Sequence, residues 1–309
     1  MAAFKTSNPS VVGILYPGTM GAALADVLVA RGFDVITTLN GRSIRTAEHC
    51  ERSGIVTRNC LADVVREADL IFSTVTPNAA VTMAEDVRQA AVRRDRSLIY
   101  IDMNSVSPQT VGRMVKKFQN SSVQFVDAAV HGIASRLKTQ GAVFASGPGA
   151  DVLNRLFGTD VRVRILGNDA GRASLMKMML GGMSKGIIGL FLQSSLLAQN
   201  SEMTDEFCDE LDHYYPDVLS FVERSLPTYV QHAGRRAQEM REFAATLESN
   251  EQPSEIALEL STLFSSLEES DLASVCHHEP TPLKLKRLVE VISATRSPVK
   301  YNRSDTFLV

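Results

Sequence analysis

The chain has 309 residues, of which 44% are hydrophobic and 22% charged, and its formal net charge is −3. This length exceeds what one compact core usually holds, so we expect two domains. The slightly acidic balance offers no basic field, which argues against a nucleic-acid partner. Four cysteines stand far apart without a C-x-x-C pair, so neither a disulfide framework nor a zinc site is suggested. We expect reduced thiols and a cytoplasmic location.

Segment 11–43 has the order of an apolar strand (11–15), a glycine turn, an amphipathic helix (22–30) and a second strand. Gly18 and Gly21 stand where the second and third glycines of G-x-G-x-x-G belong, and Tyr16 replaces the first. The helix N-terminus after such a turn favours a pyrophosphate. We therefore expect cofactor contacts from Tyr16, Pro17, Gly18, Thr19 and Met20.

The choice of dinucleotide depends on the end of the second strand, where an Asp or Glu would bind a ribose hydroxyl. No carboxylate stands there; instead the chain has Asn40, Arg42, Ser43 and Arg45. Guanidinium groups and a hydroxyl suit a 2′-phosphate, which favours NADP(H) over NAD(H). The alternative is that Arg42 and Arg45 only solvate a loop and the start of the next helix.

Further apolar runs alternate with helices along the first half of the chain, at 70–75, 98–102, 123–130, 142–146 and 161–166. This rhythm predicts an α/β fold, with a doubly wound parallel sheet in a Rossmann domain over residues 11–167. Residues 168–295 read as an all-helical domain, with helices at 175–198, 205–211, 216–225, 229–247, 254–268 and 282–294. Residues 1–10 and 296–309 read as a flexible N-terminus and a tail.

Segment 175–198 is apolar over a membrane-spanning length. However, Lys177 and Lys185 would each be costly in lipid, so we expect no membrane contact and a long helix buried between the domains.

Lys177 is the best candidate for chemistry in the second half. Gly181 and Ser184 follow it by four and seven residues, so all three share one helix face, and the glycine leaves room beside the ammonium. Burial would make Lys177 a capable proton donor and acceptor near neutrality. The alternative is a structural lysine that snorkels or pairs with a carboxylate.

Several ordered segments resemble the β-hydroxyacid dehydrogenase and 6-phosphogluconate dehydrogenase-like superfamily, in the branch with a DUF1932-type C-terminal domain. YPGTMG resembles its G-x-G-x-M-G turn, IDMNSVSP its D-x-S-T-x-x-P loop, and FVDAAVHG its substrate loop D-A-P-V-S-G. KMMLGGMSKG resembles K-M-x-Y-A-x-x-T-K-G, and GRRAQEMREFAATL resembles the C-terminal helix of the branch.

This resemblance implies that Lys177 is the proton donor or acceptor. It also implies that Thr76 and Pro77 lie against the cofactor and that Asn104 and Ser105 approach its nicotinamide ribose. The substrate would meet a further set of residues, namely Ser105, Gly132, Gly181 and Ser184. Local turn chemistry is the alternative for the polar residues that end strands.

Two positions depart from the family pattern. His131 replaces the serine that holds substrate, and Leu180 replaces an asparagine three residues after the lysine. An imidazole can bind a carbonyl or donate a proton, so His131 is a second catalytic candidate, although a loop histidine is often structural.

Together these features predict an NADPH-dependent oxidoreductase that transfers a hydride to or from a small carbonyl or hydroxy compound. The alternatives are an imine reductase and an inactive NADP-binding sensor or scaffold. We also expect a homodimer, because the long apolar helix needs another surface to cover it.

Overall fold

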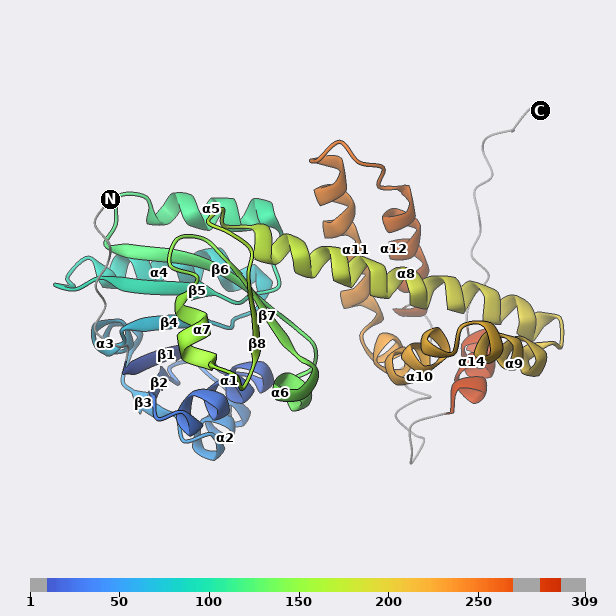
Figure 1. Ribbon diagram of the computed structural model, residues 1–309, viewed down its shortest axis with the longest axis horizontal. Coiled ribbons are helices and arrows are strands. Elements are labelled where there is room, and N and C mark those ends of the chain that lie inside the picture. Colours follow the sequence, from blue (N-terminus) through green and yellow to red (C-terminus); the bar gives the residue numbers. More distant parts are fainter. Residues whose placement is uncertain (1–9, 269–283, 296–309) are drawn as a thin grey trace. The chain divides into compact units, whose positions relative to one another are not determined.

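The computed structural model describes residues 10–268 and 284–295 (Figure 1). Most of the predicted flexible N-terminus, the predicted tail, Cys276, and the adjacent His277 and His278 lie outside these residues. The chain divides into two compact units, Met1–Met178 and Met179–Val309. The division falls within one helix, α8 (Arg172–Asn200).

The first unit is built on an eight-stranded sheet in the order β3-β2-β1-β4-β5-β6-β7-β8 (Figure 1). Its strands are β1 (Val11–Leu15), β2 (Asp34–Thr38), β3 (Val56–Arg58), β4 (Leu70–Ser73), β5 (Leu98–Asp102), β6 (Val123–His131), β7 (Ala142–Ser146) and β8 (Arg162–Ile165). The first six strands are parallel and follow the order of a doubly wound dinucleotide-binding sheet, which confirms the predicted fold class.

The last two strands correct one detail of the prediction. β7 runs antiparallel to β6, and β8 is parallel to β7. The connection 132–141 holds only a short turn of 3-10 helix (Ala134–Arg136) and α6 (Leu137–Gln140). It is too short for the crossover that a parallel pair requires, so the chain reverses direction.

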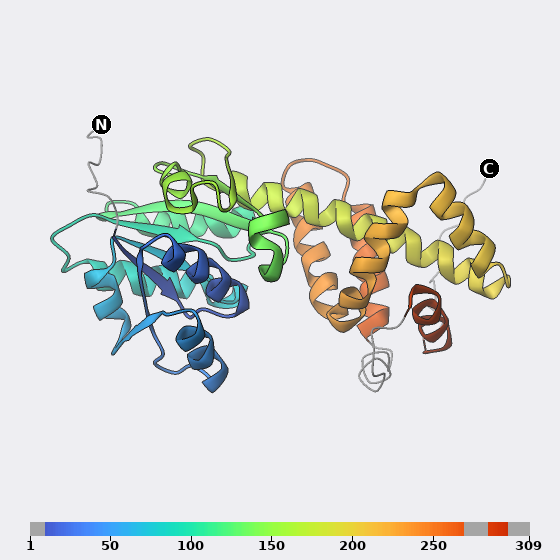
Figure 2. The same ribbon diagram turned by 60° about the horizontal axis from the view of Figure 1, so that its bottom comes forward.

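Helices cover both faces of this sheet (Figures 1 and 2). One face packs against α1 (Thr19–Ala30), α2 (Ile44–Arg52) and α7 (Val152–Phe157), and the other against α3 (Leu61–Glu67), α4 (Pro77–Ala91) and α5 (Pro108–Phe118). Helix α1 begins three residues before the predicted start. Alternate residues of β1, β2, β4 and β5 enter the two cores, as expected for strands that are buried on both faces.

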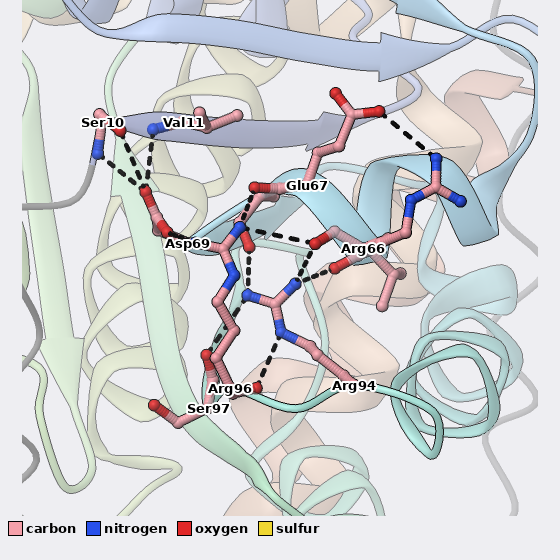
Figure 3. A network of polar contacts seen from close by, with 10 residues as sticks. Ser10, Val11, Arg66, Glu67, Asp69, Arg94, Arg96 and Ser97 are labelled. Carbon is pink, nitrogen blue, oxygen red and sulfur yellow. Dashed lines mark hydrogen bonds and ion pairs between the residues drawn. The ribbon is translucent and has the colours of Figure 1, made fainter.

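A network of arginines ties together the amino ends of β1, β4 and β5 (Figure 3). Arg94 donates to several backbone carbonyls at the end of α3 and beyond it, including that of Ala68 at 2.6 Å. Asp69 accepts from the backbone N–H groups of Ser10 (2.9 Å) and Val11 (3.1 Å) and pairs with Arg96 (2.6 Å). These contacts fix the amino end of β1 beside the amino ends of β4 and β5. We call this side of the sheet, where the parallel strands begin, its amino edge, and the opposite side its carboxyl edge.

The second unit is helical, as predicted. It contains most of α8 together with α9 (Thr204–Tyr214), α10 (Pro216–Gln231), α11 (Ala233–Glu248), α12 (Glu255–Glu268) and α14 (Leu285–Thr295). The predicted break at 226–228 is wrong, because α10 continues through Pro227 and ends at Gln231. Leu226, Tyr229 and Val230 are buried in the core, and their burial outweighs the hydrogen bond that proline removes.

Within the second unit, α8 packs on its neighbours through glycines. A Cβ at Gly182 would overlap the Phe243 ring of α11, and one at Gly189 would overlap the Leu260 side chain of α12. In the described part of the chain, α8 is the one helix that is long and apolar enough to cross a membrane. We expected it to be buried, but only 28% of its most apolar window is buried, and its large exposed apolar residues are Met179, Met183, Leu190 and Leu197.

Candidate active site at the carboxyl edge of the sheet

The glycine turn after β1 has the geometry that the motif requires. Tyr16 has a φ of 55°, in the left-handed region that favours glycine, which explains why the family pattern has a glycine there. At Gly21 a Cβ would lie 2.8 Å from Thr74 Oγ1 and 3.0 Å from Pro17, so only glycine allows this close packing of α1. Gly21 therefore has the packing role predicted for it.

The start of α1 fits a pyrophosphate. Gly18 precedes the helix and is exposed, and within the described residues a Cβ there would meet nothing within 4 Å. The same residues supply no side chain that caps the helix. Its first N–H groups are thus available to an anion, which the helix dipole also favours. Thr19 is exposed, Met20 is half-buried and Pro17 is buried beneath the turn.

The loop after β2 comes back to this turn. The Arg42 guanidinium lies 3.9 Å from the centroid of the Tyr16 ring, which is a cation–π contact. Ser43 caps α2 by accepting from the Thr46 N–H at 3.4 Å, so its side chain has a local structural task. Asn40 and Arg45 are exposed on the same loop and the following first turn. The structure therefore brings together Tyr16 and Arg42 from two predicted cofactor-binding segments.

Thr76 and Pro77 begin α4 at the same edge of the sheet. Both are exposed, Pro77 occupies the first turn of the helix, and the Thr76 side chain makes no capping hydrogen bond within the described structure. They follow β4 at the edge where the carboxyl ends of the parallel strands meet, so their predicted contact with a cofactor stays a prediction.

A buried row of polar side chains crosses four strands near this edge. Ser73 of β4 pairs in register with Asp102 of β5, Asp102 with Asp127 of β6, and Asp127 with Ser146 of β7. All four residues are fully buried. Buried polar groups are costly unless they are paired, so this row marks a place where the core serves something other than packing.

Asp102 and its neighbour Asn104 are each incompletely paired. The Asn104 side-chain amide donates to Asp102 Oδ1 and, at 3.0 Å, to Ser73 Oγ. Asp102 Oδ2 and Asn104 Oδ1 are buried and have no hydrogen-bond partner among the described residues. Burial, and then the neighbouring Asp127, raise the pKa of Asp102 to about 7.

Asp127 attaches the start of α8 to the sheet. Its Oδ2 accepts from the backbone N–H groups of Gly171 (2.9 Å), Ala173 (3.0 Å) and Ser174 (3.1 Å). Ser174 Oγ also donates to Asp127 Oδ1 at 2.6 Å. A carboxylate at a helix N-terminus satisfies otherwise unpaired N–H groups. This cap fixes the first turn of the helix that carries Lys177.

Lys177 lies one turn beyond this cap. Its Nζ donates to Ser105 Oγ at 2.7 Å, and Ser105 follows Asn104 in the loop after β5. The side chain is half-buried, whereas we expected a buried ammonium. Lys177 is also one of the charges that act on Asp102, whose pKa it lowers against the larger effects of burial and Asp127. Three predicted site residues, Asn104, Ser105 and Lys177, are thus gathered at one place.

His131 ends β6, and Gly132 follows it. His131 is half-buried, with its ring centroid 6.4 Å from that of Phe144. Gly132 has a φ of 114°, and a Cβ there would lie 3.2 Å from the Gly141 backbone. The structure therefore gives Gly132 a conformational reason to be glycine, alongside the predicted substrate contact.

Gly181 and Ser184 belong to the second unit. Lys185 Nζ donates to the Gly181 carbonyl at 3.2 Å and pairs with Glu239 of α11 at 2.9 Å, and Gly181 leaves space for this ammonium. Ser184 Oγ donates to the Leu180 carbonyl of its own helix at 2.9 Å. Lys185 is buried, and burial lowers its pKa. Its ion pair gives it a structural role.

Asp102 and Asp127 were not among the predicted site residues, although both lie in segments that resemble the family pattern. The available signal was a polar residue in otherwise apolar strands, as in LIFS, LIYID and FVDAAVH. Only the strand register shows that these polar residues form one row.

Two family models match the chain. The NAD binding domain of 6-phosphogluconate dehydrogenase matches residues 10–155, and the domain of unknown function DUF1932 matches residues 198–267. A curated relative, the uncharacterized 28.5 kDa protein in the 7S RNA 5′ region of Methanothermus fervidus, is 27% identical over 214 residues. That alignment covers 68% of this chain and 80% of the relative.

Solved structures share the fold. A conserved protein of unknown function, described as structurally similar to 3-hydroxyacid dehydrogenases, has a TM-score of 0.67 and 26% identity, covering 84% of this chain and 98% of that one. Mycobacterium tuberculosis 3-hydroxyisobutyrate dehydrogenase with L-serine has a TM-score of 0.70 and 13% identity, covering 92% and 99%.

An imine reductase and a reductive aminase are also similar in fold. An imine reductase variant from Myxococcus stipitatus with NAD+ has a TM-score of 0.59 and 17% identity, covering 93% of this chain and 100% of that one. A reductive aminase from Aspergillus terreus with NADPH has a TM-score of 0.55 and 15% identity, covering 92% and 99%. By its two family models, the chain combines the NAD binding domain of 6-phosphogluconate dehydrogenase with a DUF1932 domain.

Proposed function

We propose that this protein is an NADPH-dependent oxidoreductase that moves a hydride to or from a small carbonyl or hydroxy compound, with Lys177 as the proton donor or acceptor. The observation that carries the proposal is the hydrogen bond from Lys177 Nζ to Ser105 Oγ, 2.7 Å long, at the carboxyl edge of a dinucleotide-binding sheet. Ligands bind doubly wound sheets at this edge.

The chain supplies binding, orientation and a proton. The uncapped start of α1 would hold the pyrophosphate, and Thr76, Pro77 and Asn104 would flank the rest of the cofactor. The bound nicotinamide supplies or accepts the hydride. Ser105 holds the Lys177 ammonium in one position, from which Nζ can give a proton to the oxygen of a carbonyl as it is reduced. In the opposite direction the neutral amine would take the proton.

The preference for NADPH is supported by the loop after β2. Arg42 and Arg45 bring two positive charges, and the Tyr16 contact holds the Arg42 guanidinium beside the glycine turn. A planar guanidinium matches phosphate oxygens, so this loop suits a 2′-phosphate. Relatives of this fold carry NAD+ in one structure and NADPH in another, so the preference has to come from residues of this chain.

An imine substrate is the second candidate. His131 and Leu180 stand where the family pattern has the serine and asparagine expected to hold a hydroxyacid. Loss of those groups weakens the case for a carboxylate substrate and favours a less polar C=N compound. His131 would then be a second proton donor, because an imidazolium can give up a proton near neutral pH.

Replacing Lys177 tests the proposal. We expect Lys177→Met to lower turnover on a responsive substrate by about a hundredfold to ten-thousandfold while NADPH binding is kept. The measurement is NADPH oxidation over a panel of carbonyl compounds and preformed imines. Lys116→Met, an exposed lysine of α5, is the matched control and should act as wild type.

The panel also separates the rival functions. Activity of Lys177→Met equal to that of wild type would exclude the proton role. Tight NADPH binding by a wild-type protein that reduces nothing in the panel would favour the sensor or scaffold.

We further propose that the protein is a cytoplasmic homodimer. Met183, Leu190 and Leu197 recur every seven residues on the exposed side of α8, which is the spacing of a helix seam. A second copy presents the same stripe, so the contact can be self-complementary about a two-fold axis. Light scattering after gel filtration should give a dimer for wild type and for Val92→Glu, and a monomer for Leu190→Glu. A wild-type monomer would contradict this assembly.

A further inference from the structure

The carboxyl group of Asp102 is deeply buried and only half satisfied. Oδ1 accepts from the Asn104 amide, whereas Oδ2 has no partner among the described residues, and neither does the neighbouring acceptor Asn104 Oδ1. An ionised carboxylate only accepts hydrogen bonds, while a protonated one can also donate. A proton on Asp102 would supply a hydrogen-bond donor where two buried acceptors otherwise lack one. Without it, the cost of removing these acceptors from water is not compensated.

Charged and titratable groups act on Asp102 from three elements. Asp127 of β6 is its register partner and disfavours its ionisation, and Lys177 of α8 favours it. Tyr100 lies two residues earlier on β5, and its own pKa is raised by burial and by Asp102. The balance leaves the pKa of Asp102 at about 7, so its charge changes within the range where enzymes of this kind work.

We propose that Asp102 is a positioning residue that changes charge beside Lys177 and thereby sets how firmly Lys177 holds its proton. The two groups bind adjacent residues of the loop after β5: Asp102 accepts from Asn104, and Lys177 donates to Ser105, the next residue along the chain. Asp102 itself touches neither substrate nor cofactor in this role. Its influence on turnover rests on the proposed function, whereas its influence on Lys177 does not.

The coupling between the two charges has to be reciprocal. Since Lys177 favours ionisation of Asp102, an ionised Asp102 must favour the ammonium form of Lys177 by the same free energy. At low pH Asp102 is neutral and the ammonium lacks this support. As the pH rises, the Asp102 proton leaves to solvent, and the remaining carboxylate makes Lys177 a weaker acid and a stronger base.

NMR titrations of the full chain without substrate test the proposal. Carboxyl signals come from protein labelled with carbon-13 at aspartate, and the Asp102 signal is identified by its absence in Asp102→Asn. Amine signals come from carbon-13 dimethylated lysines, and Lys177 is identified with Lys177→Arg. The matched control is Asp169→Asn, which removes an exposed carboxylate shortly before α8.

We expect the wild-type Asp102 carboxyl to titrate near neutrality and the exposed aspartates to titrate near pH 4. The midpoint of the Lys177 titration should fall by about one unit in Asp102→Asn, which is typical for losing a close opposite charge, and should stay unchanged in Asp169→Asn. An Asp102 that titrates with the exposed aspartates would overturn the proposal. Equal Lys177 midpoints in the two variants would do the same.

If Asp102→Asn does not fold, wild type alone decides the question. The Lys177 signals should then show a second, smaller inflection at the pH where the late carboxyl ionises, and a single inflection would refute the coupling. These readouts involve no turnover. Intact coupling together with full activity of Lys177→Met would refute the proposed function and leave this inference standing. Absence of coupling together with loss of activity in Lys177→Met would refute this inference and leave the proposed function standing.

Discussion

In the first unit, charged side chains lie both where the parallel strands begin and where they end, but they are paired differently at the two places. At the amino edge, Arg94 and Arg96 donate to backbone carbonyls, and both oxygens of Asp69 are used (Figure 3). At the carboxyl edge, Asp102 and Asp127 are register partners, and Asp102 Oδ2 is left without a partner among the described residues.

The difference shows what each edge does. Charges that are fully paired with the backbone hold strands in place and are expected to matter for stability. Like charges placed side by side, with an unpaired oxygen, are a poor way to stabilise a core. They persist where perturbed titration serves binding or chemistry.

The largest expected effect is a difference between wild type and Asp102→Asn in how the unfolding free energy depends on pH. A carboxyl whose pKa is raised on folding stabilises the protein at low pH, and this stabilisation is lost as the pH rises from about 4 to above 7. Asp102→Asn cannot ionise, so the unfolding free energy of wild type relative to the variant should fall by up to about 4 kcal/mol over that range. Urea unfolding at pH 4 and pH 8 measures it. If the unfolding free energies of the two proteins changed equally between pH 4 and pH 8, this would contradict the account of the carboxyl edge.

At the amino edge, we expect substitution of Arg94 to lower stability without changing cofactor binding. Arg94→Ala leaves several carbonyls around the end of α3 without their donor, and the unfolding free energy should fall by about 3 kcal/mol. The exposed neighbour Arg93→Ala should change it by less than about 0.5 kcal/mol. NADPH affinity per folded molecule should be unaffected. A variant that folds normally but loses NADPH would mean that the two edges are not separate in function.

A smaller effect is expected at the loop after β2. Arg42→Ala should weaken NADPH binding by about tenfold to a hundredfold and leave NADH binding nearly unchanged, because only the 2′-phosphate is lost as a partner. Arg52→Ala, at the far end of α2, is the control. Calorimetric titration measures the affinities for NADPH and NADH and hence their ratio. Equal losses of affinity for the two cofactors would show that Arg42 does not select the 2′-phosphate.

Local sequence patterns were sufficient to predict the fold class and most of the strands and helices. β1, β5 and β7 have the predicted bounds, because each is a short apolar run between clear turns. The direction of β7 was not predictable from its residues, since it depends on the length and path of the connection. The three-residue β3 carries too little pattern to be recognised.

The site was predictable in part. The glycine turn and the lysine helix have local signatures, and Lys177 and Ser105, 72 residues apart, were both among the predicted site residues. The Asp102–Asp127 pair was missed because two single polar residues in different strands become neighbours only through register. Likewise, the ion pair of Lys185 with Glu239 depends on how α11 packs on α8, which no local pattern specifies.

Hydrogen exchange of the full chain with and without NADPH tests most directly whether the carboxyl edge is the functional one. We predict new protection of the N–H groups at the start of α1 and around Asn104 and Ser105, with no change at Ser10 and Val11 on the amino edge. Protection confined to the amino edge, or none at saturating NADPH, would contradict the account.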